Sequence, residues 1–228
     1  MDGSAAPSPR RRPVEGGYAR GEETRERIIE AAFVVFAEEG YVGASTRRIA
    51  SEAGVNPPAL QYYFHSKEGL HRACGQAIVD RVMLVLGPAL DEARTAIAAR
   101  DREASVAALC TLIEWTADFA MARVETEGWS RFLGRCQTDD LGPASAVVNE
   151  GISFPLKSTA TALVACALGL EADDPIARLR AIFILSQMTA LHHHRDHLLD
   201  LMDWPNFEAE RAQTVKAVLR ENVMALLG

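Results

Sequence analysis

The stretch from Ser45 to Leu70 holds the side chains whose types and spacing point most directly to recognition chemistry. The carboxamide of Gln61 can pair bidentately with adenine N6 and N7, and tyrosine hydroxyls can reach phosphate oxygens. Proline and alanine side chains can touch the methyl group of thymine. At helical spacing these groups would share one exposed surface, formed by Pro57, Pro58, Ala59, Gln61, Tyr62 and Tyr63. Their chemistry suits the major groove of DNA.

Polar and basic side chains flank this set. Arg47 can reach a base edge or a phosphate. Three more residues can clamp the DNA backbone, namely Thr46, Arg48 and Lys67. The net charge of −7 argues against a nucleic-acid partner for the chain as a whole. However, residues 73–228 hold most of the acidic excess, whereas residues 41–72 carry four basic side chains against two acidic ones, so the charge does not exclude DNA.

Two short helices joined by a tight turn must position these side chains. Ser45 can cap the first helix, which stops at Gly54, and Asn56 can cap the second ahead of Pro57. The residues expected to pack inward are Ile49, Val55, Leu60 and Phe64. This arrangement is a helix-turn-helix, whose second helix enters the major groove. Similar helix pairs also occur in proteins that never bind DNA, so geometry alone leaves both possibilities open.

The remaining sequence indicates an all-α fold. From Glu22, apolar residues recur at three- and four-residue steps up to Gly40, which occupies a C-cap position. Residues 1–21 are rich in Gly, Pro, Ser and Ala and are expected to form a disordered tail. Pro88 and Pro155 are expected to kink or split two of the later helices. Those helices are expected near residues 67–98, 102–124, 127–137, 143–169, 174–200 and 206–226.

The sequence lacks the common motifs of catalysis, of cofactor binding and of membrane insertion. The sequence contains no G-x-S-x-G, no glycine-rich phosphate loop and no H-E-x-x-H, so we expect neither an enzyme nor a cofactor. The four cysteines are too far apart for a C-x-x-C pair, which fits a reducing cytoplasm. Without a run of about 18 apolar residues or a signal peptide, no membrane partner is expected.

A run of histidines from His192 to His197 raises the question of metal binding. His193 and His197 lie four residues apart, as a chelating pair on a helix would, but no obvious further ligand completes a site. We therefore expect no metal. A cationic helix end and a pH-dependent contact between subunits remain the alternatives.

Residues from Thr24 to about Val82 resemble the N-terminal domain of the TetR family of bacterial transcriptional repressors. The similarity lies in TRERIIEAAFVVFAEEGY, STRRIASEAGV and ALQYYFHSKEGL. It implies a three-helix DNA-binding head on a helical domain that dimerises and binds a small molecule. It also implies DNA-facing roles for Thr46, Arg47, Pro57, Pro58, Ala59, Gln61, Tyr62, Tyr63 and Lys67. Gln61 stands where the family usually has tyrosine, so no operator sequence is implied.

The C-terminal part is similar to the CecR-like branch of that family, in GWSRFLGRCQTDDLGPA and in DDPIARLRAIFILSQMTALHHHRDHLLDLMDW. The usual Arg-Glu pair of the first segment appears here as Arg135-Cys136. Candidates for the lining of an effector site are Trp115, Phe119, Trp129, Phe132 and Phe154, although each could equally fill the core. If Arg135 points inward it needs a carboxylate, which Glu114, Asp118 or an acidic ligand could supply.

The last two long helices carry more apolar surface than one buried stripe requires, which favours a homodimer. Their apolar residues are Ile182, Phe183, Leu185, Met188 and Leu191, with Val215, Val218, Leu219, Val223 and Leu226. We expect a disordered tail (1–21), a helix-turn-helix DNA-binding domain (22–72) and a helical effector-binding and dimerisation domain (73–228). The leading hypothesis is a cytoplasmic repressor that binds a palindromic double-stranded operator and is released by a small-molecule effector. A helical interaction module of the same fold without specific DNA binding is the alternative.

Overall fold

The computed structural model describes residues 15–121, 128–138 and 142–227, and every regular element in these segments is helical. The all-α fold is confirmed. The elements are α1 (Glu15–Gly43), α2 (Thr46–Glu52), α3 (Pro57–Phe64), α4 (Lys67–Ala99), α5 (Arg102–Met121), α6 (Gly128–Thr138), α7 (Pro143–Val148), the π-helical turn η1 (Asn149–Ser153), α8 (Phe154–Leu168), α9 (Pro175–His193), α10 (Arg195–Leu201) and α11 (Ala209–Leu227).

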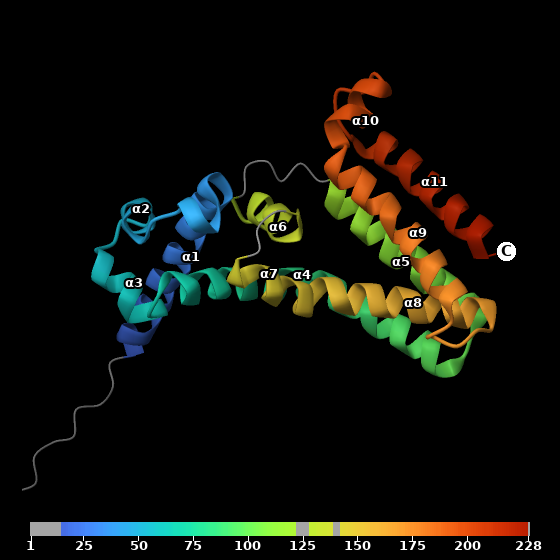
Figure 1. Ribbon diagram of the computed structural model, residues 1–228, viewed down its shortest axis with the longest axis horizontal. Coiled ribbons are helices and arrows are strands. Elements are labelled where there is room, and N and C mark those ends of the chain that lie inside the picture. Colours follow the sequence, from blue (N-terminus) through green and yellow to red (C-terminus); the bar gives the residue numbers. More distant parts are fainter. Residues whose placement is uncertain (1–14, 122–127, 139–141, 228) are drawn as a thin grey trace, which may run out of the picture.

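Helices α1 to α3 and the first turns of α4 form a head at one end of the elongated molecule (Figure 1). The predicted caps are present: the Ser45 hydroxyl accepts from the Arg48 amide, and the Asn56 carboxamide oxygen accepts from the Ala59 amide, both at 3.2 Å. Gly54 adopts the positive φ of 64° that the turn between α2 and α3 requires. The apolar residues Ile49, Leu60 and Phe64 are buried in the head, as expected.

Helix α1 differs from its prediction at both ends. It begins at Glu15, whereas the apolar pattern predicted a start at Glu22, because a helix can extend beyond the residues that it buries. Its C-terminal part contains a break at Gly40 (φ 71°, ψ 173°), where the pattern placed the end of the helix, and a further turn follows to Gly43.

Helix α4 runs without interruption from the head into the C-terminal part, and Pro88 does not split it (Figure 1). Pro155, by contrast, lies in the first turn of α8. The π-helical turn η1 directly precedes it and separates α7 from α8. Only one of the two prolines therefore marks a division.

Helices α4, α5, α8, α9 and α11 pack together as the C-terminal bundle, with α10 at its upper end in Figure 1. Three helical stretches (Lys67–Ala99, Arg102–Met121 and Pro143–Leu168) are long and apolar enough to cross a membrane by length and composition alone. They pack against one another, and 39–50% of each apolar stretch is buried within the protein. Their apolar character is in large part that of the bundle core.

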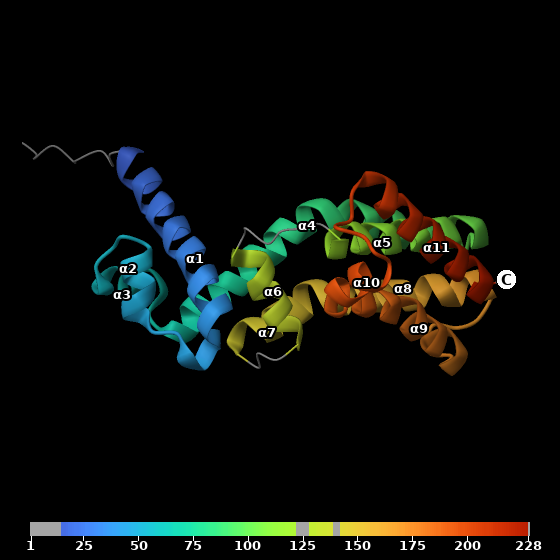
Figure 2. The ribbon, with the colours of Figure 1, turned by 90° about the horizontal axis from the view of Figure 1, so that it is seen from above.

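Helices α6 and α7 occupy the junction between head and bundle, and Figure 2 shows them beside α1 and α4. Two glycines permit the close contact of this segment with its neighbours. A Cβ atom on Gly75 of α4 would lie 3.1 Å from the backbone of Ala144 in α7. One on Gly151 of η1 would lie 2.6 Å from the Val79 side chain of α4. The junction is tightly packed on α4.

Candidate nucleic-acid interface and effector site

Helix α3 presents the predicted recognition residues on the surface of the head. Pro57, Pro58, Gln61 and Tyr62 are exposed, and Tyr62 is 76% accessible. Ala59 and Tyr63 are partly buried. The rings of Tyr62 and Tyr63 pack edge to face with their centroids 5.0 Å apart. Four of the six predicted residues therefore face solvent, whereas Tyr63 also packs against the buried core.

The cations near this surface differ in how they are held. Arg47 is exposed and forms no ion pair with any residue that the structure describes. Arg48 pairs with Glu38 at 2.7 Å and with Glu39 at 3.1 Å. Thr46 is partly buried at the start of α2. Of the arginines at the start of α2, only Arg47 reaches solvent without an internal partner among the described residues.

Lys67, on the first turn of α4, also has internal partners. Its Nζ donates to the carbonyl of Val42 at 3.2 Å and lies 4.9 Å from the centre of the Tyr41 ring. Both contacts are with the C-terminal end of α1. No pattern in the sequence indicates these contacts, because neither Val42 nor Tyr41 belongs to the helix-turn-helix pattern. The predicted phosphate-clamping role of Lys67 stays a prediction.

Three of the predicted effector residues form a row of aromatic rings. The rings of Trp115 and Phe119 on α5 stack with centroids 5.8 Å apart, and Phe119 lies 6.0 Å from Trp129 on α6. All three side chains are partly buried. We call Trp115, Phe119 and Trp129 the aromatic row.

The structure does not bring the other predicted lining residues to this row. Phe132 is fully buried in the head, with its ring centroid 5.5 Å from that of Phe33 and 6.0 Å from that of Phe36. Phe154 is 65% exposed at the start of α8. The six predicted residues therefore do not form one cavity.

Neither of the two carboxylates suggested for Arg135, Glu114 and Asp118, pairs with it among the described residues. Arg135 donates from Nη1 to the backbone carbonyl of Ala37 in α1, at 3.0 Å, because α6 docks on α1. Glu114 instead accepts from Arg220 at 2.8 Å, and this hydrogen bond, with the charge of Glu114, raises the pKa of Arg220. Asp118 pairs with Lys216 at 3.0 Å.

A hollow of about 410 Å³ lies where the end of α5 meets α10 and the start of α11. Its lining includes Asp118, Met121, Arg195, Phe207 and Ala212. None of these was among the predicted lining residues. The cluster of Trp204 and Phe207, whose rings lie 6.2 Å apart edge to face, was the available signal in the sequence.

The histidine run lies partly outside the described residues. His194 and His197 are exposed, whereas the side chains of His192 and His193 are not described. Among the side chains that the structure describes, no group of three or more His, Cys, Asp or Glu residues could hold a metal ion.

The head, the exposed face of α3 and the helical bundle define a helix-turn-helix transcription regulator. A family model described as "Bacterial regulatory proteins, tetR family" matches residues 28–74. The model for the C-terminal domain of the HTH-type transcriptional dual regulator CecR matches residues 106–228, more than half of the chain. The chain belongs to the TetR family, and its C-terminal domain is of the CecR type.

Individual relatives agree with this assignment. The chain is 29% identical over 216 residues to the dual regulator CecR of Shigella flexneri, covering 91% of this chain and 93% of that protein. It is 37% identical over 110 residues to the activator FasR of Mycolicibacterium smegmatis, covering 46% and 48% of the two chains.

Solved structures share the fold. A putative transcriptional regulator from Pseudomonas aeruginosa PAO1 is similar with a TM-score of 0.63 and 20% identity, covering 94% of this chain and 95% of that chain. FadR from Bacillus subtilis, solved with stearoyl-CoA, is similar with a TM-score of 0.55 and 14% identity, covering 89% and 97%. Together with the family models and the curated relatives, this identifies the chain as a transcription regulator of a non-enzyme family, with a DNA-binding helix-turn-helix.

Proposed function

We propose that this regulator is a repressor that binds a palindromic double-stranded operator as a homodimer, with α3 in the major groove. The observation that carries the proposal is the exposed face of α3, which offers Gln61 and Tyr62; Arg47 of α2 is also exposed and forms no ion pair with a described residue. Gln61 supplies base discrimination, and the hydroxyl and guanidinium groups supply phosphate contacts. A head bound at a promoter would block polymerase by occupying its site.

Dimerisation is supported by an apolar face on α9 and α11. We define this face by its exposed apolar side chains, which are 48–59% accessible: Ile176, Leu179, Ile182, Phe183, Val218 and Met224. Of the residues predicted for this role, Leu191, Leu219 and Val223 are instead buried within the subunit. Several exposed apolar side chains on two long helices are typical of a subunit contact. A two-fold dimer would place the heads in successive major grooves about 34 Å apart.

We propose that the chain divides into a DNA-binding domain (22–72) and an effector-binding and dimerisation domain (73–228). A small apolar effector that binds at the aromatic row of the second domain would release the protein from DNA. Trp115, Phe119 and Trp129 supply flat apolar surface and are partly open to solvent. Such an effector can release DNA only if it binds the non-operator conformation more tightly. We place this activity in the cytoplasm, without a membrane partner.

The test is selection of duplexes from a random DNA library, followed by titration of the selected duplex over a salt series. We expect enrichment of an inverted repeat, with affinity that falls as salt rises because phosphate contacts release counterions. A Gln61→Ala and Tyr62→Ala double variant is the matched control and should lose the enrichment. If the wild-type chain shows no salt-sensitive binding, the chain is an interaction module of the same fold. A thermal-shift screen of apolar small molecules, with hits tested for release of the selected duplex, addresses the effector.

A further inference from the structure

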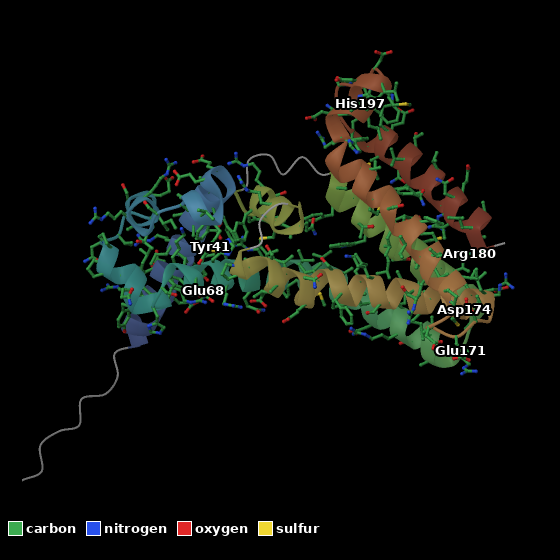
Figure 3. The ribbon with its side chains drawn as sticks, in the orientation of Figure 1. Tyr41, Glu68, Glu171, Asp174, Arg180 and His197 are labelled. Atoms are coloured by element: carbon green, nitrogen blue, oxygen red, sulfur yellow. The ribbon has the colours of Figure 1, made fainter. Side chains whose placement is uncertain are left out.

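The C-terminal end of α1 is held by cations from three other helices. Arg135 of α6 donates to the carbonyl of Ala37 at 3.0 Å. Arg48 of α2 pairs with Glu38 and Glu39, and Lys67 of α4 donates to the carbonyl of Val42 at 3.2 Å. All the partners lie between residues 37 and 42, on either side of the break at Gly40. In Figure 3, Tyr41 marks this end of α1, and Glu68 marks the first turn of α4.

The break at Gly40 explains why cations gather there. Near a helix end, carbonyl groups lose their amide partners and carry partial negative charge, which favours nearby cations. Arg135 fits closely against the break: a Cβ atom on Gly40 would lie 3.1 Å from its Nη2. The Nε of Arg135 is buried and has no hydrogen-bond partner among the described residues, so the hydrogen bond from Nη1 to Ala37 partly compensates for the burial of the guanidinium group.

Helix α6 is fixed to α1 at two further points. Phe132 is fully buried against Phe33 and Phe36. A Cβ atom on Gly128 would lie 2.9 Å from the Val34 side chain and 3.0 Å from its backbone nitrogen. A shift of α6 must therefore either carry the end of α1 with it or break the contact between Arg135 and Ala37.

We propose that Arg135 is a positioning residue for DNA binding: it holds the end of α1 in the place from which Lys67 and Arg48 are presented to DNA phosphates. The inference rests on the proposed function, because it takes Lys67 and Arg48 as phosphate contacts. Arg48 is exposed and Lys67 is partly buried, and phosphate would compete with their internal partners for the same donors. Displacement of the end of α1 would move both cations away from the positions in which they meet phosphates, so we expect weaker binding. A movement of α6 would then reach the head through α1. Because Trp129 of the aromatic row lies on α6, an effector bound at the row could cause such a movement.

The test is a double-mutant cycle on affinity for the duplex that the wild-type chain selects. Arg135→Met removes the donors and keeps much of the volume, and Lys67→Met removes the phosphate contact. We expect Arg135→Met to weaken binding about tenfold and to make the dependence of affinity on salt shallower. Added to Lys67→Met, it should weaken binding much less, because the two residues act on one contact. Arg131→Met, an exposed position on α6, is the matched control and should bind as wild type.

A structural readout accompanies the cycle. Hydrogen exchange of the amides of residues 40–44 should be faster in Arg135→Met and normal in Arg135→Lys, which retains a donor. If Arg135→Met does not fold, Arg135→Leu, which also lacks a donor, replaces it in the cycle. Additive effects of Arg135 and Lys67 substitutions, or unchanged exchange at residues 40–44, would overturn this inference while leaving the proposed function intact. Absence of salt-sensitive binding by the wild-type chain would instead remove the proposed function, and this inference with it.

Discussion

The imidazole Nδ1 of His71 accepts a hydrogen bond of 2.9 Å from the backbone amide of Ala144, 73 residues further along the chain. His71 is fully buried and packs edge to face against Phe36 and Phe132. Because Nδ1 is the acceptor, it carries no proton in this arrangement. The bond joins the beginning of α4, in the head, to the first turn of α7 at the junction.

Replacement of His71 by Phe should destabilise the protein by about 1–3 kcal/mol, because the buried Ala144 amide loses its acceptor. The aromatic volume is nearly retained, so the loss reports on the hydrogen bond. The midpoint of urea unfolding measures it. His197→Phe, at an exposed position, is the control and should leave the midpoint unchanged. Equal midpoints for His71→Phe and wild type would show that the bond contributes nothing.

The close contact between Gly151 and Val79 predicts that a larger residue at position 151 destabilises the protein and that a smaller residue at position 79 restores part of the stability. Gly151→Ala should cost about 1–3 kcal/mol through overpacking, because its Cβ would meet the Val79 side chain at 2.6 Å. Gly151→Ala combined with Val79→Ala should lose less than the sum of the two single changes. Gly87→Ala has open space around its Cβ and should be neutral or stabilising by about 0.5–1 kcal/mol. Thermal unfolding distinguishes these variants, and strict additivity would contradict the proposed clash.

The four cysteines should differ in reactivity. Burial raises the pKa of the Cys74 thiol well above its ordinary value, and the neighbouring Cys136 adds to the effect. Burial also raises the pKa of Cys110. Since the thiolate is the reactive form, Cys74 and Cys110 should resist iodoacetamide at pH 8, and Cys166, which is only partly buried, should react first. Mass spectrometry of the alkylated protein measures the order, with urea-unfolded protein as the control. Early labelling of Cys74 in the folded protein would contradict the expectation.

Gln61 and Lys67 should affect DNA binding in different ways. Gln61→Ala should lower discrimination at one base pair by about 1–3 kcal/mol, because a bidentate contact with adenine is lost. Lys67→Ala should weaken binding to all sequences alike, because a phosphate carries no base identity. Competition titrations with single-base variants of the selected duplex separate the two effects. The opposite result, with sequence preference changed only by Lys67→Ala, would show that α3 is oriented differently on DNA.

If the apolar face of α9 and α11 forms the subunit contact, a charged side chain placed in it should prevent dimerisation. Phe183→Glu should convert the dimer to a monomer, because a carboxylate in an apolar contact lacks a partner. Sedimentation velocity measures the change. Leu84→Glu is the matched control: Leu84 is exposed on α4, away from this face, and the variant should remain dimeric. A dimeric Phe183→Glu variant would place the subunit contact elsewhere.

The sequence predicts where the helices of this fold lie along the chain better than it predicts which helices pack against one another. Capping residues such as Ser45, Asn56 and Asp174 hydrogen-bond to their own helix, so helix starts follow from local chemistry. Apolar spacing likewise identifies Phe132 as buried. It does not say against which helix, and Phe132 packs into the head instead of the expected effector site. The partner of Arg135 was equally hard to predict. Its hydrogen-bond acceptor is a backbone carbonyl, and every residue has one, so the sequence does not indicate which carbonyl is used. The exposed residues of α3 were predictable because the recognition pattern is local.

The docking of α6 on α1 also bears on how the protein is made. Arg135 follows Ala37 by 98 residues, so at about 5–20 residues per second the ribosome needs roughly 5–20 s to supply the last side chains of the head's core. During that interval Phe33 and Phe36 lack their ring contacts with Phe132. A head excised after α4, or one fused to a foreign C-terminal domain, would lack the same ring contacts permanently. The head therefore matures only after most of the chain has been synthesised.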